Sequence, residues 1–136
     1  MNAIPLPLPD AAEEGERRRR EALALLADRR RALVRRASRA LLGLLLRTGT
    51  ATADQLRGLV PIPPEINPKV FGAVFAGLAE ENLIRQVGSE RSRRPEAHRR
   101  PIGVWQLADR AGAITWLAAH PDQEPAEQSE RTLFDL

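Results

Sequence analysis

The chain of 136 residues contains no cysteine or tyrosine, only one methionine and two histidines, and 4% aromatic residues. Without cysteine it can form neither a disulfide framework nor a thiolate metal site, which fits a reducing cytoplasm. No apolar run approaches the roughly 20 residues of a membrane helix, and the N-terminus lacks the pattern of a signal peptide. We therefore expect a soluble cytoplasmic protein with a core of Leu, Ala and Val.

Residue patterns that support catalysis are also missing. His98 and His120 are not in a metal-ligand spacing with a nearby pair of carboxylates. Ser89 and Ser92 lack a plausible base and third partner, and the glycines form no phosphate-binding loop. The sequence predicts neither an enzyme nor a resident metal or cofactor.

Positive charge is unevenly distributed. Residues 1–48 hold eleven Arg against six acids (+5), residues 85–100 hold six Arg against two acids (+4), and residues 121–136 hold one Arg against five acids (−4). Of the 21 basic residues, 20 are Arg. The planar donor fork of Arg suits phosphate, but GC-rich coding would produce the same bias, and both explanations stay open.

Residues 1–9 alternate proline with apolar residues, which predicts an extended, flexible arm over about 1–12. From Asp10 to about Arg47 the pattern is helical, and we assign residues 13–48 to one long helix. Leucines at three- and four-residue steps form an apolar stripe, Leu23 and Leu26 among them. Since the first half is charged and Ala40–Leu46 is apolar nearly all round, the second half should be embedded in the domain.

Two further helices are expected within a core at 49–120. Thr52 and Gln55 have the spacing of a capping box, and the helix they open should present Leu56, Leu59 and Val60 to the core before prolines end it. Asn67-Pro68 predicts the next helix start. The inward face of that helix is expected to hold Phe71, Val74, Phe75 and Leu78.

A hairpin should follow. Leu83–Val87 and Ile102–Leu107 are apolar segments typical of strands, and the basic stretch Ser89–Arg100 between them should project as its tip. Trp105 is expected in the core or on a face of the hairpin rather than in base stacking. Asp109 can cap a last helix, Arg110–His120, and residues 121–136 are predicted to form a flexible acidic tail.

This order of helix, short helix, helix and basic hairpin resembles a winged helix–turn–helix domain over about residues 38–107. The run from Thr52 to Trp105 is more narrowly similar to small phage and prophage proteins of poorly defined function. The likeness is carried by Asn67, Gly72, Phe75, Leu83-Ile84, Val87-Gly88, Ser92, Arg94-Pro95, His98 and Val104-Trp105. The resemblance implies duplex DNA binding in phage-like replication or gene control, with the third helix in the major groove and the wing on the backbone or in the minor groove.

The predicted DNA contacts lie mainly in the tip. The third helix offers only Lys69 to a groove, so phosphate contacts of the tip should dominate. The candidate DNA-binding residues are Arg91, Arg93, Arg94, His98, Arg99, Arg100, Lys69 and Asn67. The alternative is a protein–protein adaptor in which the same scaffold binds a partner and the long helix dimerises.

The C-terminal end carries a second candidate site. Leu133, Phe134 and Leu136 close the acidic tail, and the segment resembles peptides by which bacterial replication and repair proteins bind the sliding clamp. Such peptides prefer Gln where Glu130 stands here, so the match is partial. Binding of a clamp-like partner and folding back of these residues on the domain both remain open.

Overall fold

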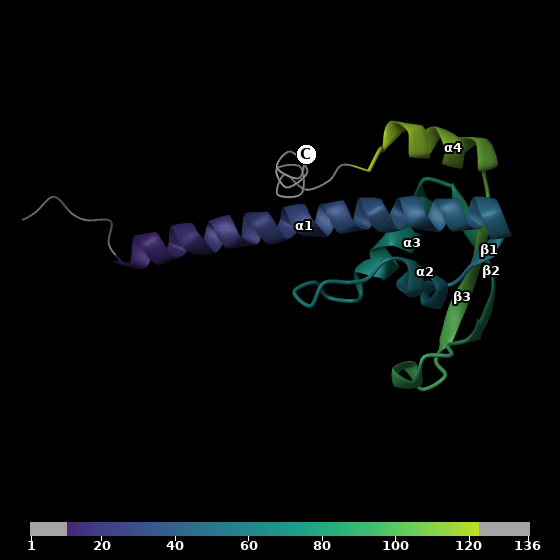
Figure 1. The fold of residues 1–136 in the computed structure, drawn as a ribbon, viewed down its shortest axis with the longest axis horizontal. Helices are drawn as coiled ribbons and strands as arrows, with labels where there is room; N and C mark the ends of the chain where they lie inside the picture. The colour runs from purple at the N-terminus through teal and green to yellow at the C-terminus, as the bar shows by residue number, and fades with distance from the viewer. Residues whose placement is uncertain (1–10, 123–136) are drawn as a thin grey trace, which may run out of the picture.

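The computed structural model describes residues 11–122. It is mainly helical, with a long N-terminal helix and a small antiparallel sheet (Figure 1). The helices are α1 (Ala11–Thr48), α2 (Ala53–Leu59), α3 (Val70–Glu80) and α4 (Arg110–Ala119), and the strands are β1 (Thr50–Ala51), β2 (Ile84–Arg91) and β3 (Pro101–Leu107). The coarse prediction of a mainly helical fold with a long N-terminal helix and a small β-hairpin is therefore confirmed. No helix within 11–122 is long and apolar enough to cross a membrane.

The helix α1 divides into two halves, as its sequence predicts. Side chains buried on it begin only at Leu33 and continue to Leu45. The N-terminal part of the half before Leu33 projects beyond the other elements (Figure 1), and from about Leu26 the helix lies beside the loop that precedes α3. Leu23 and Leu26 on the predicted stripe are exposed. Gly49 ends the helix in the left-handed region at φ 88°, and its N–H donates to the carbonyl of Leu45.

The core lies where the second half of α1 meets α2, α3 and the sheet. The inward residues predicted for α3, Phe71, Val74, Phe75 and Leu78, are all buried. The ring of Trp105 on β3 lies 5.2 Å from the ring of Phe75, which places this tryptophan against the core as expected. Leu56 and Val60 of the α2 segment are buried, but Leu59 is 48% exposed, so its predicted place in the core is wrong. On a seven-residue helix only one narrow face reaches the core.

Helix starts follow local signals with one exception. The Thr52 hydroxyl accepts from the Gln55 N–H at 3.3 Å while the Gln55 side chain accepts from the Thr52 N–H at 3.0 Å, which confirms the capping box. Asp109 caps α4 through the N–H of Gly112. By contrast, α3 begins at Val70 rather than at Pro68. Asn67, Pro68 and Lys69 form a preceding turn with bonds from i+3 to i, and the Asn67 side chain accepts from the Lys69 N–H.

The sheet contains one strand more than the expected hairpin. The order is β1-β3-β2, with Thr50 opposite Gln106 and Ala51 opposite Trp105. The two residues of β1 are too few for any periodicity, so the sequence gives no sign of this strand. They join the end of α1 to the sheet.

The hairpin extends further than its sequence predicts. Pairing between β2 and β3 runs from Ile84–Leu107 to Arg91–Pro101, with an irregularity at Val87. The stretch from Ser89 to Arg91, predicted to belong to the tip, is therefore strand. Hydrogen bonds between strand backbones do not depend on the charge of exposed side chains. Since this segment of β2 is exposed throughout, its charged residues can pair as a strand. The tip itself comprises residues 92–100.

Candidate nucleic-acid interface

The tip, residues 92–100, is a closed loop at the far end of the hairpin (Figure 1). The N–H of Ser92 donates to the carbonyl of Arg100 at 2.8 Å and closes the loop at its base. A short 3-10 helix, Pro95–Ala97, fills the middle. Arg100 N–H then donates to the carbonyl of Ala97 at 2.9 Å, which forms a tight turn back to β3. The tip is a hydrogen-bonded loop with a defined backbone.

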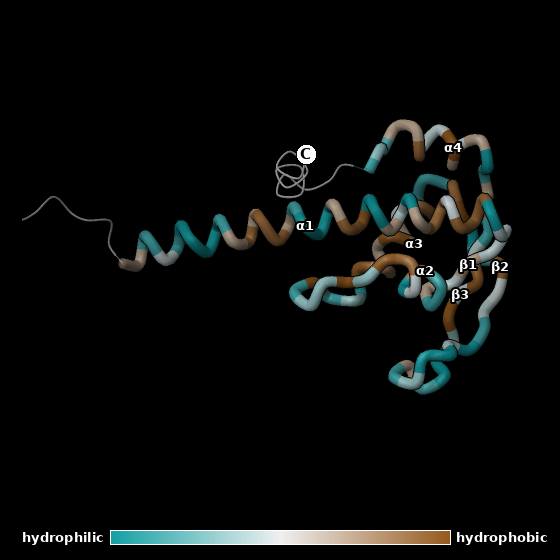
Figure 2. Tube along the Cα trace, viewed as in Figure 1, coloured by the Kyte–Doolittle hydropathy of each residue, from teal (hydrophilic) through white to brown (hydrophobic). Residues whose placement is uncertain are grey.

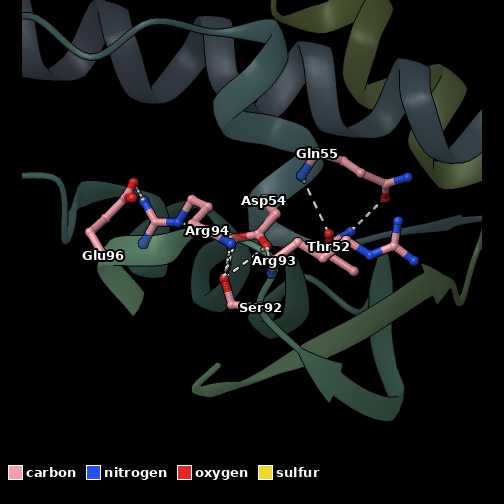
Figure 3. A network of polar contacts seen from close by, with 7 residues as sticks. All are labelled: Thr52, Asp54, Gln55, Ser92, Arg93, Arg94 and Glu96. Atoms are coloured by element: carbon pink, nitrogen blue, oxygen red, sulfur yellow. Dashed lines mark hydrogen bonds and ion pairs between the residues drawn. The ribbon is translucent and has the colours of Figure 1, made fainter. Parts of the chain in front are cut away.

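Asp54, in the first turn of α2, fixes the tip to the helical body (Figure 3). The Ser92 hydroxyl lies 2.9 Å and 3.1 Å from the two carboxylate oxygens, and the Arg93 N–H donates to Oδ2 at 3.0 Å. The same hydroxyl accepts from the Arg94 N–H at 3.2 Å. Ser92 is only 2% exposed, so these bonds satisfy a buried polar group. One carboxylate thus positions three consecutive tip residues.

Arg94 is part of this anchor. Its Nε lies 3.3 Å from Asp54 Oδ1 without the geometry of a hydrogen bond, and its Nη1 lies 3.7 Å from Glu96. The side chain is 29% exposed. The structure therefore engages within the molecule a guanidinium that the sequence predicts as a phosphate contact, because Asp54 is close enough to neutralise it. Sequence spacing gives no sign of this pair, since the two residues are 40 positions apart.

Arg57 reinforces the positive charge beside the anchor. Burial, and then the nearby Arg94 guanidinium, lower the pKa of Arg57 from its ordinary value, while Asp54 and Glu96 oppose that shift. With Arg94 and Glu96, Arg57 borders a hollow of about 430 Å³ whose other lining residues belong to the proline-rich loop before α3. Two guanidinium groups therefore stand close together where the tip meets the body.

The remaining basic residues of the hairpin face outward. Arg91, Arg93, His98, Arg99 and Arg100 are exposed. Arg91 donates to the carbonyl of Arg99 at 3.4 Å, whereas no hydrogen bond or ion pair within residues 11–122 engages the side chains of Arg93, Arg99 and Arg100. A hollow of about 450 Å³ on the tip is lined by Arg91, Ser92, Arg93, Arg94, Pro95, His98 and Arg99. Figure 2 shows this region as hydrophilic.

The turn at the end of the tip has an unusual backbone. His98 and Arg99 both lie in the left-handed region, with φ 49° and 58°. A turn with two successive positive φ values favours Asn and Gly, and a residue with a Cβ is less stable there by about 1–2 kcal/mol. A histidine and an arginine stand here where glycine fits better, and such a backbone persists only where the surrounding structure holds it, as the hydrogen bonds of the tip do.

Asn67 and Lys69, the other two predicted DNA contacts, do not border the hollow on the tip. They border a different hollow, of about 350 Å³, together with Leu26 and Arg30 of α1. The Asn67 side-chain oxygen is used locally, as acceptor for the Lys69 N–H. The exposed face of α3 consists of Gly72, Ala73, Ala76 and Gly77, with Glu80 at its end. This face has no side chain that could read base edges.

Sequence reasoning missed Asp54 as a functional residue. It reads as an ordinary acid in the first turn of a helix, where the helix dipole favours negative charge. Only the return of the hairpin toward α2 reveals its second role. The partner-binding candidates Leu133, Phe134 and Leu136 lie outside the described residues. Within residues 11–122, no cluster of three His, Asp or Glu side chains could hold a metal ion.

Comparisons with known protein families, with curated proteins and with solved structures found no match for this chain. The winged-helix assignment and the phage likeness therefore remain predictions from the sequence.

Proposed function

We propose that this chain is a winged-helix DNA-binding protein whose tip lies on the phosphate backbone of a duplex. The order of elements supports the proposal: α2 and α3 pack beside a hairpin in a sheet of order β1-β3-β2, and the hairpin ends in a basic loop. In such a domain the hairpin is the wing. Its role in phage-like replication or gene control is the part of the proposal that rests on the sequence likeness alone.

One observation carries the proposal. Asp54 holds the tip backbone in place, while no hydrogen bond or ion pair within residues 11–122 engages the exposed side chains of Arg93, Arg99 and Arg100. Arg binds phosphate oxygens with a planar fork, and an anchored loop loses less conformational freedom on binding than a mobile one. A fixed set of unpaired cations is what backbone recognition requires.

Contacts with phosphates should outweigh contacts with bases. The exposed face of α3 is made of glycine and alanine, so this helix can come close to a duplex but offers few hydrogen-bond donors. Phosphate contacts position a protein and carry no sequence information. We therefore expect affinity with little sequence preference.

The test measures fluorescence anisotropy of a labelled random duplex across a salt series. Each phosphate neutralised contributes roughly 0.9 to the slope of log K against log salt. The triple variant Arg93→Ala, Arg99→Ala, Arg100→Ala should bind more weakly and lose up to about three units of slope. The control replaces Arg47, Arg85 and Arg110, which are exposed outside the tip, and changes the net charge equally.

Two results would refute backbone recognition by the tip. One is an affinity that barely changes with salt in the wild-type chain. The other is equal weakening by the tip variant and by its charge-matched control, which would indicate attraction by net charge alone. Arg94→Ala is a third variant for this test. Because Arg94 is paired with Asp54, its loss should lower the stability of the tip as well as the affinity for DNA.

A protein–protein adaptor is the second candidate, and the projecting half of α1 favours it. Leu23, Leu25 and Leu26 are 58%, 47% and 37% exposed there, and Figure 2 shows a hydrophobic stretch within this mostly hydrophilic segment. Large apolar side chains exposed on a helix are typical of surfaces that another segment covers. Unchanged DNA affinity in the tip variant would favour this function.

A further inference from the structure

A hollow of about 520 Å³ lies between α1 and α4. We call it the α1–α4 hollow; it is lined by Ala27, Arg30, Arg31, Val34, Arg35, Ser38, Trp116 and His120. Val34 and Trp116 supply apolar surface, and both also pack against the core. Three arginines stand around that surface. The hollow therefore offers an apolar surface bordered by positive charge, outside the candidate DNA interface.

The apolar surface continues along α1 beyond the hollow. Leu23 lies four residues before Ala27, so the two share one face of the helix. Leu23 is the most exposed of the large apolar residues within 11–122. Leu25 lies roughly 200° around the helix from Leu23, on another face. The face that carries Leu23 and Ala27 is thus distinguishable from that of Leu25 by mutation.

The charge of the hollow is incompletely neutralised. Arg31 pairs with Asp28, and Arg36, next to the hollow, lies 4.0 Å from Asp122. No ion pair or hydrogen bond within the described part of the chain engages Arg30 or Arg35. An occupant with acidic groups would neutralise these two side chains, and one with apolar side chains would cover Leu23. The hollow fits an acidic peptide with an apolar end.

A second copy of α1 fits this surface poorly. An antiparallel pair of helices centred between Leu23 and Leu26 would place Arg18–Arg20 of one copy opposite Arg29–Arg31 of the other. Like charges directly opposite each other destabilise helix pairs. A symmetric dimer through this face would bring two basic stretches together at both ends of a small apolar patch.

We propose that residues 123–136 of the same chain bind along the α1–α4 hollow. This segment holds four acids and one arginine, a net charge of −3, and it includes Leu133, Phe134 and Leu136. Its charge is opposite to that of the hollow. Its apolar residues match the exposed surface that runs on from Ala27 to Leu23.

The starting point and the length of the segment permit this arrangement. The described chain leaves α4 beside α1, where Asp122 pairs with Arg36. Arg39 holds the end of α4 there by donating to the carbonyls of Leu117 and His120. From Arg36 to Leu23 the helix rises roughly 20 Å, at about 1.5 Å per residue. Fourteen residues span up to roughly 46 Å when extended, at about 3.3 Å each.

Binding of this kind has a consequence for partners. While Leu133 and Phe134 lie on α1, they are not available to a pocket on another protein. A partner that takes the segment would have to release it, and would then expose Leu23 and the two unpaired arginines. The inference is independent of DNA binding by the tip, because the two surfaces share no residue.

The test uses nuclear magnetic resonance of the full chain and of a full-length variant with Leu133→Ala, Phe134→Ala and Leu136→Ala. We expect the Trp116 indole and the amides of Ala27 and Val34 to shift between the two proteins, while the Trp105 indole stays unchanged as an internal control. The double variant Arg30→Glu, Arg35→Glu should abolish that difference. The charge-matched variant Arg85→Glu, Arg110→Glu, outside the hollow, should preserve it.

Shifts confined to residues after Asp122 would overturn the proposal. So would a difference that disappears on dilution, since that outcome assigns the segment to the hollow of a second copy. A difference that survives in the Arg30→Glu, Arg35→Glu variant would also count against it, because charge complementarity is one of its two supports. A difference that is independent of concentration and sensitive to those two arginines supports binding within one chain.

Discussion

The two halves of α1 differ although one uninterrupted helix contains both. From Leu33 to Leu45 the helix buries leucines and alanines against α3 and the sheet. From Ala11 to Ala32 it carries clusters of acidic and basic residues. Most of its ion pairs there join residues three or four apart on its own surface, and Arg29 pairs with Glu65 of the loop before α3. Exposed pairs of this kind stabilise little. The second half is therefore held by tertiary packing, and the first half by helix propensity and by whatever covers its leucines.

The tip extends the comparison. It projects from the core as the first half of α1 does, and both segments are rich in arginine. Yet Asp54 connects it to α2 through several hydrogen bonds, one of them to a buried hydroxyl. Positive charge alone does not distinguish the two projections. What distinguishes them is whether the backbone that carries the charge is fixed.

The largest effect should come from removing a buried leucine of α1. Leu41 is completely buried, so Leu41→Ala should lower the free energy of unfolding by about 2–5 kcal/mol, through lost burial and the cavity it leaves. Leu25→Ala, the same change in the projecting half, should alter it by about 0.5 kcal/mol or less. Urea denaturation measures both. Comparable losses would show that the face of Leu25 is packed in solution and would remove the contrast between the halves.

A smaller effect is expected from the anchor of the tip. Asp54→Ala leaves the buried Ser92 hydroxyl without its acceptor and removes the nearer of the two acidic partners of Arg94, which should lower the free energy of unfolding by about 1–3 kcal/mol. Asp28→Ala is the matched control, since Asp28 pairs with Arg31 on the exposed half of α1. Its effect should be about 0.5 kcal/mol or less. Equal effects of the two changes would mean that the anchor is no stronger than a surface ion pair.

The smallest effect concerns the left-handed turn of the tip. Glycine adopts positive φ without steric conflict, so His98→Gly or Arg99→Gly should raise the free energy of unfolding by about 0.5–1 kcal/mol each. Glu90→Gly, on the exposed side of β2, should lower it by a similar amount. Thermal unfolding followed by calorimetry distinguishes the higher stability expected of the turn variants from the lower stability expected of Glu90→Gly. If the turn variants are less stable than the wild type, side-chain contacts of His98 or Arg99 outweigh the backbone strain.

Local signals in the sequence predicted local structure well. The helix α1, expected from Asp10 to about Arg47, runs from Ala11 to Thr48, and the capping groups Thr52 and Asp109 act as their positions indicate. Such features depend on residues within a few positions of each other. The expected core position of Leu59 was wrong, because which side of a short helix meets the core depends on elements that come later in the chain.

The sequence by itself determined where the helices form, that the second half of α1 is buried and that a basic hairpin follows α3. Those properties follow from periodicity, capping and charge, which act over short stretches of chain. Only the tertiary structure decided that Thr50 and Ala51 become a strand, that Asp54 holds Ser92 and Arg94, and that α4 lies beside α1 to form a hollow. Each of these joins residues some 40 or more positions apart, and their pairing depends on the path of the whole chain in space.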